Sequence, residues 1–141
     1  MSLRYLLDTN TLSEPLRKIP SLTVLKKIQS HQTEIATAAL VLYEMIRGAH
    51  CLPEQAEKQV RILQYVDKFI RVNFPILPYT ETTASWHGIE VARLIMLGKT
   101  PSPIDSQIAA IAKTNDLILV TRNVKDFDCF TDLHIENWFE E

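Results

Sequence analysis

Short apolar segments alternate with longer helical patterns along this chain, and that alternation limits the folds open to it. Residues 4–7 and 117–121 have the continuous apolar character of strands that are buried on both faces of a sheet. Strands that alternate with helices predict a parallel sheet with helices on both faces, a three-layer α/β/α arrangement. The expected strands are residues 4–7, 34–37, 76–77, 117–121 and 133–135. The expected helices are residues 11–17, 21–30, 40–50, 54–73, 80–97 and 102–114.

The length and composition of the chain favour one folded domain. A chain of 141 residues with 46% hydrophobic content is long and apolar enough to bury a core. It has only three glycines, and no repeat, linker or low-complexity segment interrupts it. We therefore expect a single domain over residues 1–141.

Four carboxylates lie at positions where apolar or strand-end residues surround them. Asp8 ends the first strand, Asp126 follows a later one, and Asp105 opens a helix. Glu44 is the only charged residue between positions 35 and 46. Parallel sheets place their sites at the carboxyl ends of strands, where Asp8 and Asp126 could meet. A pocket of acids without a cation is unstable, so the pattern predicts a divalent metal.

Asp8 and Glu44 each have a structural alternative. Asp8 could cap a helix, but Thr11 and Glu14 have the spacing of a capping box, which would leave Asp8 free at the strand end. Glu44 could pair with Arg47 at i+3, although an exposed pair of this kind contributes little stability. A buried and unpaired Glu44 would be costly, which favours a functional role.

The other two acids remain more ambiguous on residue pattern alone. Ser102, Pro103 and Asp105 make a favourable helix start that needs no further role for the acid. Asp126 lies in an expected loop, and Asn123 competes with it for the same position near the strand end. Asp116 can be set aside, because it precedes the strand and lies about 16 Å from its other end.

Charge and motifs exclude several classes of protein. The net charge of −2 gives no basic surface of the kind that a passive nucleic-acid binder carries, although an enzyme that acts on nucleic acid remains possible. The chain contains no G-x-S-x-G, Walker or G-x-G-x-x-G motif, which argues against serine hydrolase, P-loop and Rossmann sites. The four histidines share no metal-binding spacing.

Two further features bear on location and partners. The chain has no apparent signal peptide and no apolar run of about 18 residues, so we expect a cytoplasmic protein with no membrane association and free thiols. Residues 54–73 carry two apolar stripes, which indicates either a helix central to the core or a contact surface for another protein.

Four motifs together resemble PIN-domain ribonucleases, and most of all the VapC toxins of bacterial toxin-antitoxin pairs. Nearly the whole chain is covered, with the motifs in the order of the family. They are Leu7-Asp8-Thr9-Asn10, residues 43–49 (YEMIRGA), residues 103–110 (PIDSQIAA), and Val120-Thr121-Arg122-Asn123 continuing to Asp126-Phe127.

The resemblance implies a PIN-like fold, a homodimer, endoribonuclease activity on RNA such as tRNA, and inhibition by a cognate VapB-type antitoxin. It also implies an Mg²⁺ or Mn²⁺ site. When the acidic site residues of the family are matched to this sequence, the first three are Asp8, Glu44 and Asp105. The fourth site position corresponds to Asn123 or Asp126.

The expected chemistry is metal-assisted hydrolysis of a phosphodiester. Asp8 and Asp105 would hold the ion, while Glu44 would bind a second ion or deprotonate the attacking water. Asp126 would position a water, helped by Asn123 and Thr121. Arg122 and Lys125 follow the same strand and would contact the RNA backbone.

Two alternatives remain open at this point. One is a catalytically inactive PIN-like module that only binds a partner. The other is a phospho-accepting receiver domain, although such domains usually carry adjacent acids after the first strand, and here Thr9 follows Asp8.

Overall fold

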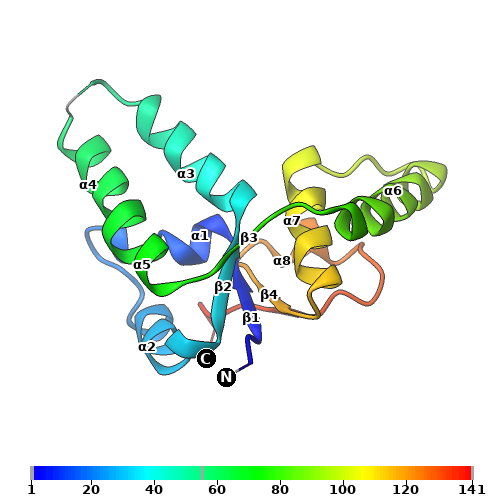
Figure 1. Cartoon of the computed structure of the whole chain (residues 1–141), viewed down its shortest axis with the longest axis horizontal. Coiled ribbons are helices and arrows are strands. Elements are labelled where there is room, and N and C mark those ends of the chain that lie inside the picture. The colour runs from blue at the N-terminus through cyan, green and yellow to red at the C-terminus, as the bar shows by residue number, and fades with distance from the viewer. Residues whose placement is uncertain (1, 55, 141) are drawn as a thin grey trace.

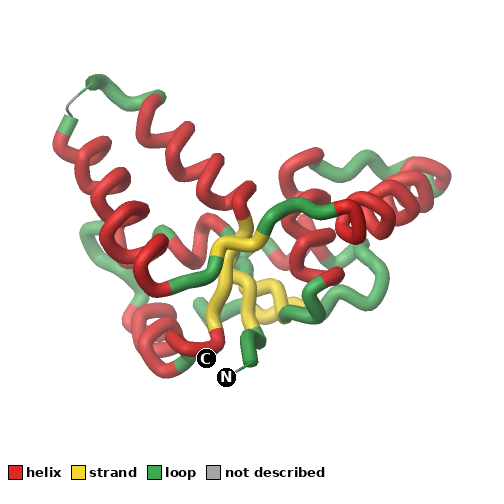
Figure 2. The backbone as a smooth tube through the Cα atoms, viewed as in Figure 1, coloured by secondary structure: helices red, strands yellow, loops and turns green. Residues whose placement is uncertain are grey.

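A five-stranded parallel sheet forms the centre of the molecule. The computed structural model describes residues 2–54 and 56–140. The strand order is β3-β2-β1-β4-β5, and each neighbouring pair is parallel (Figures 1 and 2). The strands are β1 (Tyr5–Leu7), β2 (Ile35–Ala38), β3 (Ile76–Leu77), β4 (Ile118–Val120) and β5 (Ile135–Glu136). The predicted parallel sheet is confirmed.

Helices surround this sheet in two groups. On one side α3 and α4 form a pair, and on the other α6 and α7 lie together beside α8 (Figure 1). The predicted three-layer α/β/α class is therefore confirmed. The helical segments are α1 (Thr9–Leu12), η1 (Glu14–Leu16), α2 (Leu22–Ser30), η2 (Gln32–Glu34), α3 (Ala39–His50), α4 (Glu57–Tyr65), η3 (Val66–Ile70), α5 (Arg71–Asn73), α6 (Glu81–Met96), α7 (Pro103–Thr114) and α8 (Val124–Phe127).

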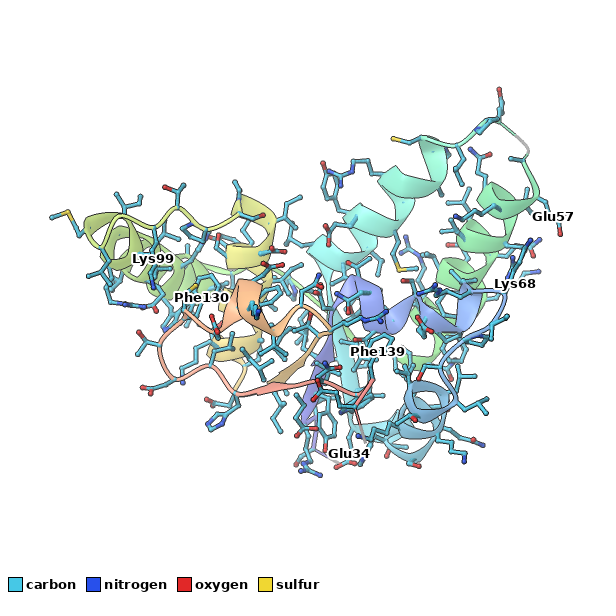
Figure 3. The ribbon with its side chains drawn as sticks, turned by 180° about the vertical axis from the view of Figure 1, so that it is seen from behind. Glu34, Glu57, Lys68, Lys99, Phe130 and Phe139 are labelled. Atoms are coloured by element: carbon cyan, nitrogen blue, oxygen red, sulfur yellow. The ribbon has the colours of Figure 1, made fainter. Side chains whose placement is uncertain are left out.

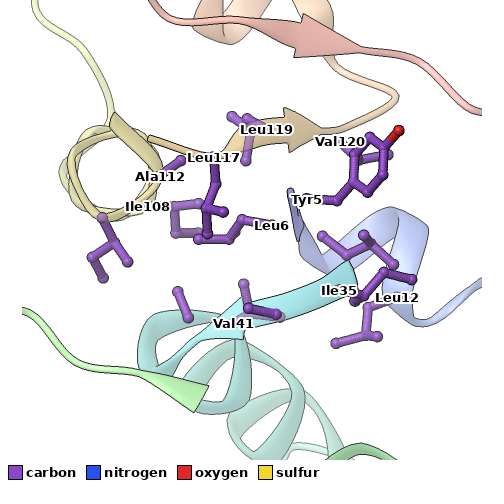
Figure 4. Close-up of a cluster of buried hydrophobic side chains, with 14 of the residues drawn as sticks. Tyr5, Leu6, Leu12, Ile35, Val41, Ile108, Ala112, Leu117, Leu119 and Val120 are labelled. Carbon is purple, nitrogen blue, oxygen red and sulfur yellow. The ribbon is translucent and has the colours of Figure 1, made fainter. Parts of the chain in front are cut away.

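The core explains why the central strands are apolar throughout. All three residues of β1 are buried, because helices cover both faces of a parallel sheet. Figure 4 shows Leu6 beside Ile108 and Ala112 of α7, whereas Tyr5 lies away from that helix. Burial on both faces removes the alternation of polar and apolar residues that one-sided strands display.

The first helix differs from the predicted one. It begins at Thr9 rather than Thr11, and the Asp8 carboxylate caps it by accepting the Thr9 N–H at 2.8 Å. The predicted capping box at Thr11 and Glu14 is wrong, because β1 runs into α1 with no intervening loop. Glu14 is buried and accepts the Ser21 N–H at 2.8 Å at the start of α2.

The long helix predicted over residues 54–73 also differs from the structure. It begins at Glu57, and its middle section η3 is a π-helix. Residue 55 of the predicted range lies outside the described residues. Val66 and Ile70 of this wider section are buried, while Val72 beyond it is 72% exposed. Apolar periodicity assumes a constant helical turn, so it could not locate this change of pitch.

The remaining elements agree closely with prediction, with two exceptions. The helices expected at 21–30, 40–50, 80–97 and 102–114 are present within one residue at each end. Helix α8 was missed because four residues are too few for a periodic pattern, and the last strand lies at Ile135–Glu136 rather than 133–135. None of the helices within residues 2–54 and 56–140 has the length and apolar character needed to cross a bilayer.

Candidate metal centre at the carboxyl edge of the sheet

The pairing of β1 with β4 brings residues from both ends of the chain together. Leu7 lies opposite Val120, and the next residue, Asp8, donates its backbone N–H to the Val120 carbonyl at 2.9 Å. Thr121 follows Val120, and its hydroxyl donates to the Asp8 carboxylate at 2.9 Å. The parallel register therefore sets Asp8 and Thr121 side by side at the carboxyl edge.

Asp8 is a buried carboxylate with three donors. Besides the Thr9 N–H and the Thr121 hydroxyl, it accepts from the Asn10 amide at 3.3 Å. Burial raises the pKa of Asp8, and the charge of Glu44 acts in the same direction. The three donors oppose that shift, because hydrogen bonds to a carboxylate favour its ionised form.

Glu44 reaches the same edge from α3. Its carboxylate accepts a hydrogen bond from the Thr9 hydroxyl at 2.7 Å. The predicted alternative of a Glu44–Arg47 pair is wrong: no ion pair joins them among the described residues. The Arg47 guanidinium lies 5.1 Å from the ring centroid of Tyr43 and donates to the Tyr43 hydroxyl at 3.3 Å. Glu44 therefore faces Thr9 and the Asp8 end of the sheet.

Asp105 lies in the first turn of α7, where Ser102 and Pro103 begin the helix as predicted. Partial burial, followed by the negative charges of Asp8, Asp126 and Glu44, raises the pKa of Asp105 to about 6. The other three carboxylates therefore act electrostatically on Asp105 at this edge of the sheet.

Asp126 and Asn123 occupy different places at this edge. Asp126 lies on the short helix α8 rather than in the expected loop, and with Asp105 it lines a cleft of about 360 Å³. Asn123 donates its backbone N–H to the Thr121 hydroxyl at 3.1 Å, but its side chain does not cap α8. Asp126 therefore acts on Asp105 by its charge, while Asn123 contributes a backbone contact.

The two basic residues proposed for RNA contact have unequal positions. Lys125 lines the cleft that contains Asp105. The guanidinium of Arg122 instead lies 4.7 Å from the ring centroid of Phe139, a residue near the middle of the molecule in Figure 3. Lys99, at the end of α6, lines the same cleft and was not singled out from the sequence.

Sequence reasoning also missed the roles of Thr9 and Asn10. The Asn10 amide donates to both Asp8 and Thr121 at 3.3 Å, and its oxygen accepts the Arg122 N–H at 2.9 Å. These contacts tie the residues after β1 to those after β4. The signal was the run Asp8-Thr9-Asn10 directly after a strand, which belongs to the first family motif but gave no separate role to Thr9 or Asn10.

A larger groove opens beside the acids. It has a volume of about 870 Å³, and Thr9 and Glu44 are among its lining residues. Its other apolar and basic side chains come from η1 and the three residues after it, from α3 and from α4. They are Leu16, Ile19, Met45, Ile62, Arg17, Lys18, Lys58 and Arg61. The groove therefore joins an apolar, cation-rich surface to the acidic edge.

The donor set suits a hard divalent ion. Carboxylate oxygens are the ligands that Mg²⁺ and Mn²⁺ prefer, and burial together with the negative charges of three other acids raises the pKa of Asp105. Over residues 2–54 and 56–140, no three His, Cys, Asp or Glu side chains form a preassembled chelating group. The residues thus fit a cation in chemistry and charge without forming a closed cage.

Comparison with known proteins agrees with this geometry. The family model described as the PIN domain matches residues 5–129, which include all four acids. The tRNA(fMet)-specific endonuclease VapC of Shigella flexneri is 28% identical over 136 residues, 96% of this chain and 98% of that relative. FitAcB from Neisseria gonorrhoeae has a TM-score of 0.86 at 28% identity, covering 97% of this chain and 99% of that chain. DNA-bound VapBC from Salmonella typhimurium has a TM-score of 0.84 at 28% identity, covering 96% and 98%. Because the family model spans most of the chain, the protein belongs to the PIN domain family.

Proposed function

We propose that this protein is a metal-dependent endoribonuclease and the toxin of a VapBC-type toxin-antitoxin pair, using Mg²⁺ or Mn²⁺. The observation that carries the proposal is the convergence of three negative charges on Asp105 at the carboxyl edge of the sheet. A divalent ion would relieve that repulsion. The similarity to the Shigella endonuclease VapC supports RNA as the substrate.

The four acids would divide the chemistry between them. Asp8 and Asp105 would hold the ion, and Asp8 is kept in place by Thr121 and Thr9. Glu44 would accept a proton from the attacking water or hold a second ion. A bound Mg²⁺ makes a nearby water more acidic and offsets charge on the phosphate. Asp126 would orient that water, with Thr121 and Asn123 in support.

The RNA would cross the cleft between the end of α6 and α8. Lys99 and Lys125 line this cleft beside Asp105 and Asp126, and they would contact phosphates that flank the cleaved one. Arg122 could join them only after leaving the ring of Phe139. The name of the Shigella relative favours tRNA as the substrate class.

A VapB-type antitoxin would bind in the groove of about 870 Å³. The groove has an apolar floor and several cations, which suits an amphipathic segment with acidic residues. Because Glu44 and Thr9 line the groove, a bound segment would also reach the acidic edge. The Salmonella neighbour, a VapBC structure, is consistent with a partner of this kind.

Two further properties belong to this proposal. Residues 1–141 would act as a single PIN domain in the cytoplasm. The chain would form a homodimer through the outer face of α6, where Ile89, Ile95 and Met96 are largely exposed. Ile89 and Met96 are seven residues apart and so share one face of α6, and an apolar patch on a helix face can mark a contact surface.

The decisive experiment is RNA cleavage by antitoxin-free protein with and without Mg²⁺ or Mn²⁺. Asp8→Asn should lower the cleavage rate at least about 100-fold, because it removes a charged ligand from the buried end of the site. Asp116→Asn is a matched control, since Asp116 is exposed at the far end of β4 and its φ of 55° suits Asn. Cleavage that survives Asp8→Asn, or that needs no metal, would overturn the mechanism.

The alternative of an inactive PIN-like partner-binding module is tested by the same preparation. Calorimetric titration with Mn²⁺ should show binding to the wild-type protein and to Asp116→Asn, and weaker binding to Asp8→Asn. A protein that binds antitoxin but neither binds Mn²⁺ nor cleaves RNA would be such a module.

A further inference from the structure

A chain of hydrogen bonds from α6 ends on the first turn of α7, beside Asp105. The Tyr79 hydroxyl and His87 Nδ1 are 2.8 Å apart, and His87 Nε2 lies 2.8 Å from the Ser106 hydroxyl. The Ser106 hydroxyl donates to the Pro103 carbonyl at 2.9 Å. These hydrogen bonds therefore connect the exposed Tyr79 to the helix turn that carries Asp105, a proposed metal ligand.

The contacts determine where the protons lie. Ser106 has one hydroxyl proton, and Pro103 offers only an acceptor, so that proton points to the Pro103 carbonyl. Ser106 must then accept from His87, which places a proton on Nε2 and leaves Nδ1 to accept from Tyr79. Burial lowers the pKa of His87, which favours this neutral form.

Two other hydrogen bonds hold the first turn of α7, and one of them runs from the Ser106 N–H to the Ser102 carbonyl at 2.9 Å. Pro103 has no N–H to donate, and the Ser102 hydroxyl accepts the Asp105 N–H at a long 3.5 Å. Ser106 is only 2% exposed, so its hydroxyl interacts with protein groups, His87 and the Pro103 carbonyl, rather than with solvent. Asp105 lies in this turn beside other negative charges, and the Ser106 side chain links the same turn to α6 through His87.

We propose that His87 and Ser106 are positioning residues that hold the first turn of α7 and thereby set the Asp105 carboxylate toward Asp8 and Asp126. The inference rests on the proposed function, because it assigns these residues a role in metal binding and cleavage. Neither residue contacts the metal or the RNA. They act through the backbone of residues 103–106.

The same pair of helices supplies a matched control. At the other end of α7, the Thr83 hydroxyl lies 3.2 Å from that of Thr114, which donates to the Ala110 carbonyl at 2.7 Å. This second relay also joins α6 to a carbonyl of α7. Thr114 is nine residues from Asp105, about 13 Å along the helix. Thr114→Val therefore removes a comparable interaction far from the acids.

The test compares Mn²⁺ affinity and cleavage in Ser106→Ala and Thr114→Val. Ser106→Ala should weaken Mn²⁺ binding and lower kcat about tenfold, as loss of an orienting partner commonly does, with KM little changed. Thr114→Val should leave both within about twofold of wild type. His87→Gln, whose amide can still donate to Ser106, should retain more Mn²⁺ affinity than His87→Leu. Equal effects of Ser106→Ala and Thr114→Val would overturn the proposal.

Two measurements keep this result separate from the proposed function. Nitrogen chemical shifts in the metal-free protein should identify the Nε2–H form of His87, and an Nδ1–H form would overturn the hydrogen-bond chain. Amide exchange should become faster at residues 105–107 in Ser106→Ala and unchanged there in Thr114→Val. If the wild-type protein binds no Mn²⁺ but shows the Nε2–H form of His87 and the faster exchange in Ser106→Ala, the metal site is refuted. The proposal that His87 and Ser106 hold the first turn of α7 is then still supported. Unchanged amide exchange at residues 105–107 in Ser106→Ala would overturn the proposal that Ser106 holds the first turn of α7.

Discussion

Asp105 is a carboxylate whose ionised form the folded protein disfavours. Burial and the charges of three other acids raise its pKa from 3.8 to about 6. Because the folded value lies above the unfolded one, the folded state binds the proton more tightly. The stability of the metal-free protein should therefore fall as pH rises from about 4 to about 6.

The substitution Asp105→Asn should reverse this effect. At neutral pH it should stabilise the metal-free protein by roughly 1 kcal/mol, a modest gain because the group is partly solvated. At about pH 3.5 the two proteins should unfold alike. Mn²⁺ should then raise the melting temperature of the wild type and leave that of the variant almost unchanged. A variant less stable than wild type at neutral pH would contradict the repulsion inferred for this site.

At the scale of residues, the sequence singled out the acids but not the side chains that contact them. Asp8 and Glu44 stood out because charges are costly beside apolar segments. Thr9 and Asn10 did not, since their side chains suit any helix start. Their partners Glu44 and Thr121 lie 35 and 111 residues away in the sequence. Only the folded chain shows that Thr9 and Asn10 link Asp8 to those partners.

At the scale of elements, hydrogen bonds to the Glu90 carboxylate connect α6 to the segment after α8. It is 5% exposed, and its carboxylate accepts from Arg93 and from the Thr131 N–H, both at 2.6 Å. The hydrogen bond from Arg93 lowers the pKa of Glu90 to about 2, from a usual 4.5. A depressed folded pKa means that the carboxylate stabilises the protein above about pH 4.5 and stops doing so as pH falls toward 2.

Glu90→Gln should therefore destabilise the protein in a pH-dependent way. At neutral pH the free energy of unfolding should fall by about 2 kcal/mol, because a buried charge-assisted contact is lost. The difference from wild type should shrink as pH falls from about 4.5 toward 2. Urea unfolding at several pH values measures this, with Glu81→Gln as the exposed control on the same helix. A difference that is constant with pH would rule out the ion pair as its cause.

Helix α7 and the section η3 show which elements a sequence can predict. Helix α7 has a serine cap, a proline at its first position and a regular apolar face, so its ends were predicted within one residue. The π-helical section has no such local signal. The Tyr65 hydroxyl, just before it, donates to the Leu12 carbonyl at 2.7 Å, a contact between residues 53 apart. Such long-range contacts are invisible to local periodicity.

At the scale of the whole molecule, the outer face of α6 predicts self-association. Ile89→Lys should convert a dimer to a monomer in light scattering, because a lysine that is solvated in the monomer would be buried in the dimer. Val72→Lys on α5 is the matched control, since Val72 is 72% exposed, close to the 74% of Ile89, but lies on the other helical group. A dimer that Val72→Lys disrupts, while Ile89→Lys does not, would place the contact on the long helix instead.

The layered architecture was predictable from the sequence, but the strand order was not. Alternating strands and helices require a parallel sheet with two covered faces. Nothing local says that β1 pairs with both β2 and β4, since those pairings depend on which faces fit together. The convergence of Asp8 with Thr121 follows from that order alone.

The pairing of Asp8 with Thr121 also governs when the protein can become active. The two residues are 113 positions apart, and Thr121 directly follows β4. During synthesis from the N-terminus, Asp8 leaves the ribosome long before its neighbour across the sheet exists. An unfinished chain that ends before β4 lacks the strand that completes this edge. A protein that cuts RNA would thus remain harmless to the ribosome that is making it until β4 has been synthesised.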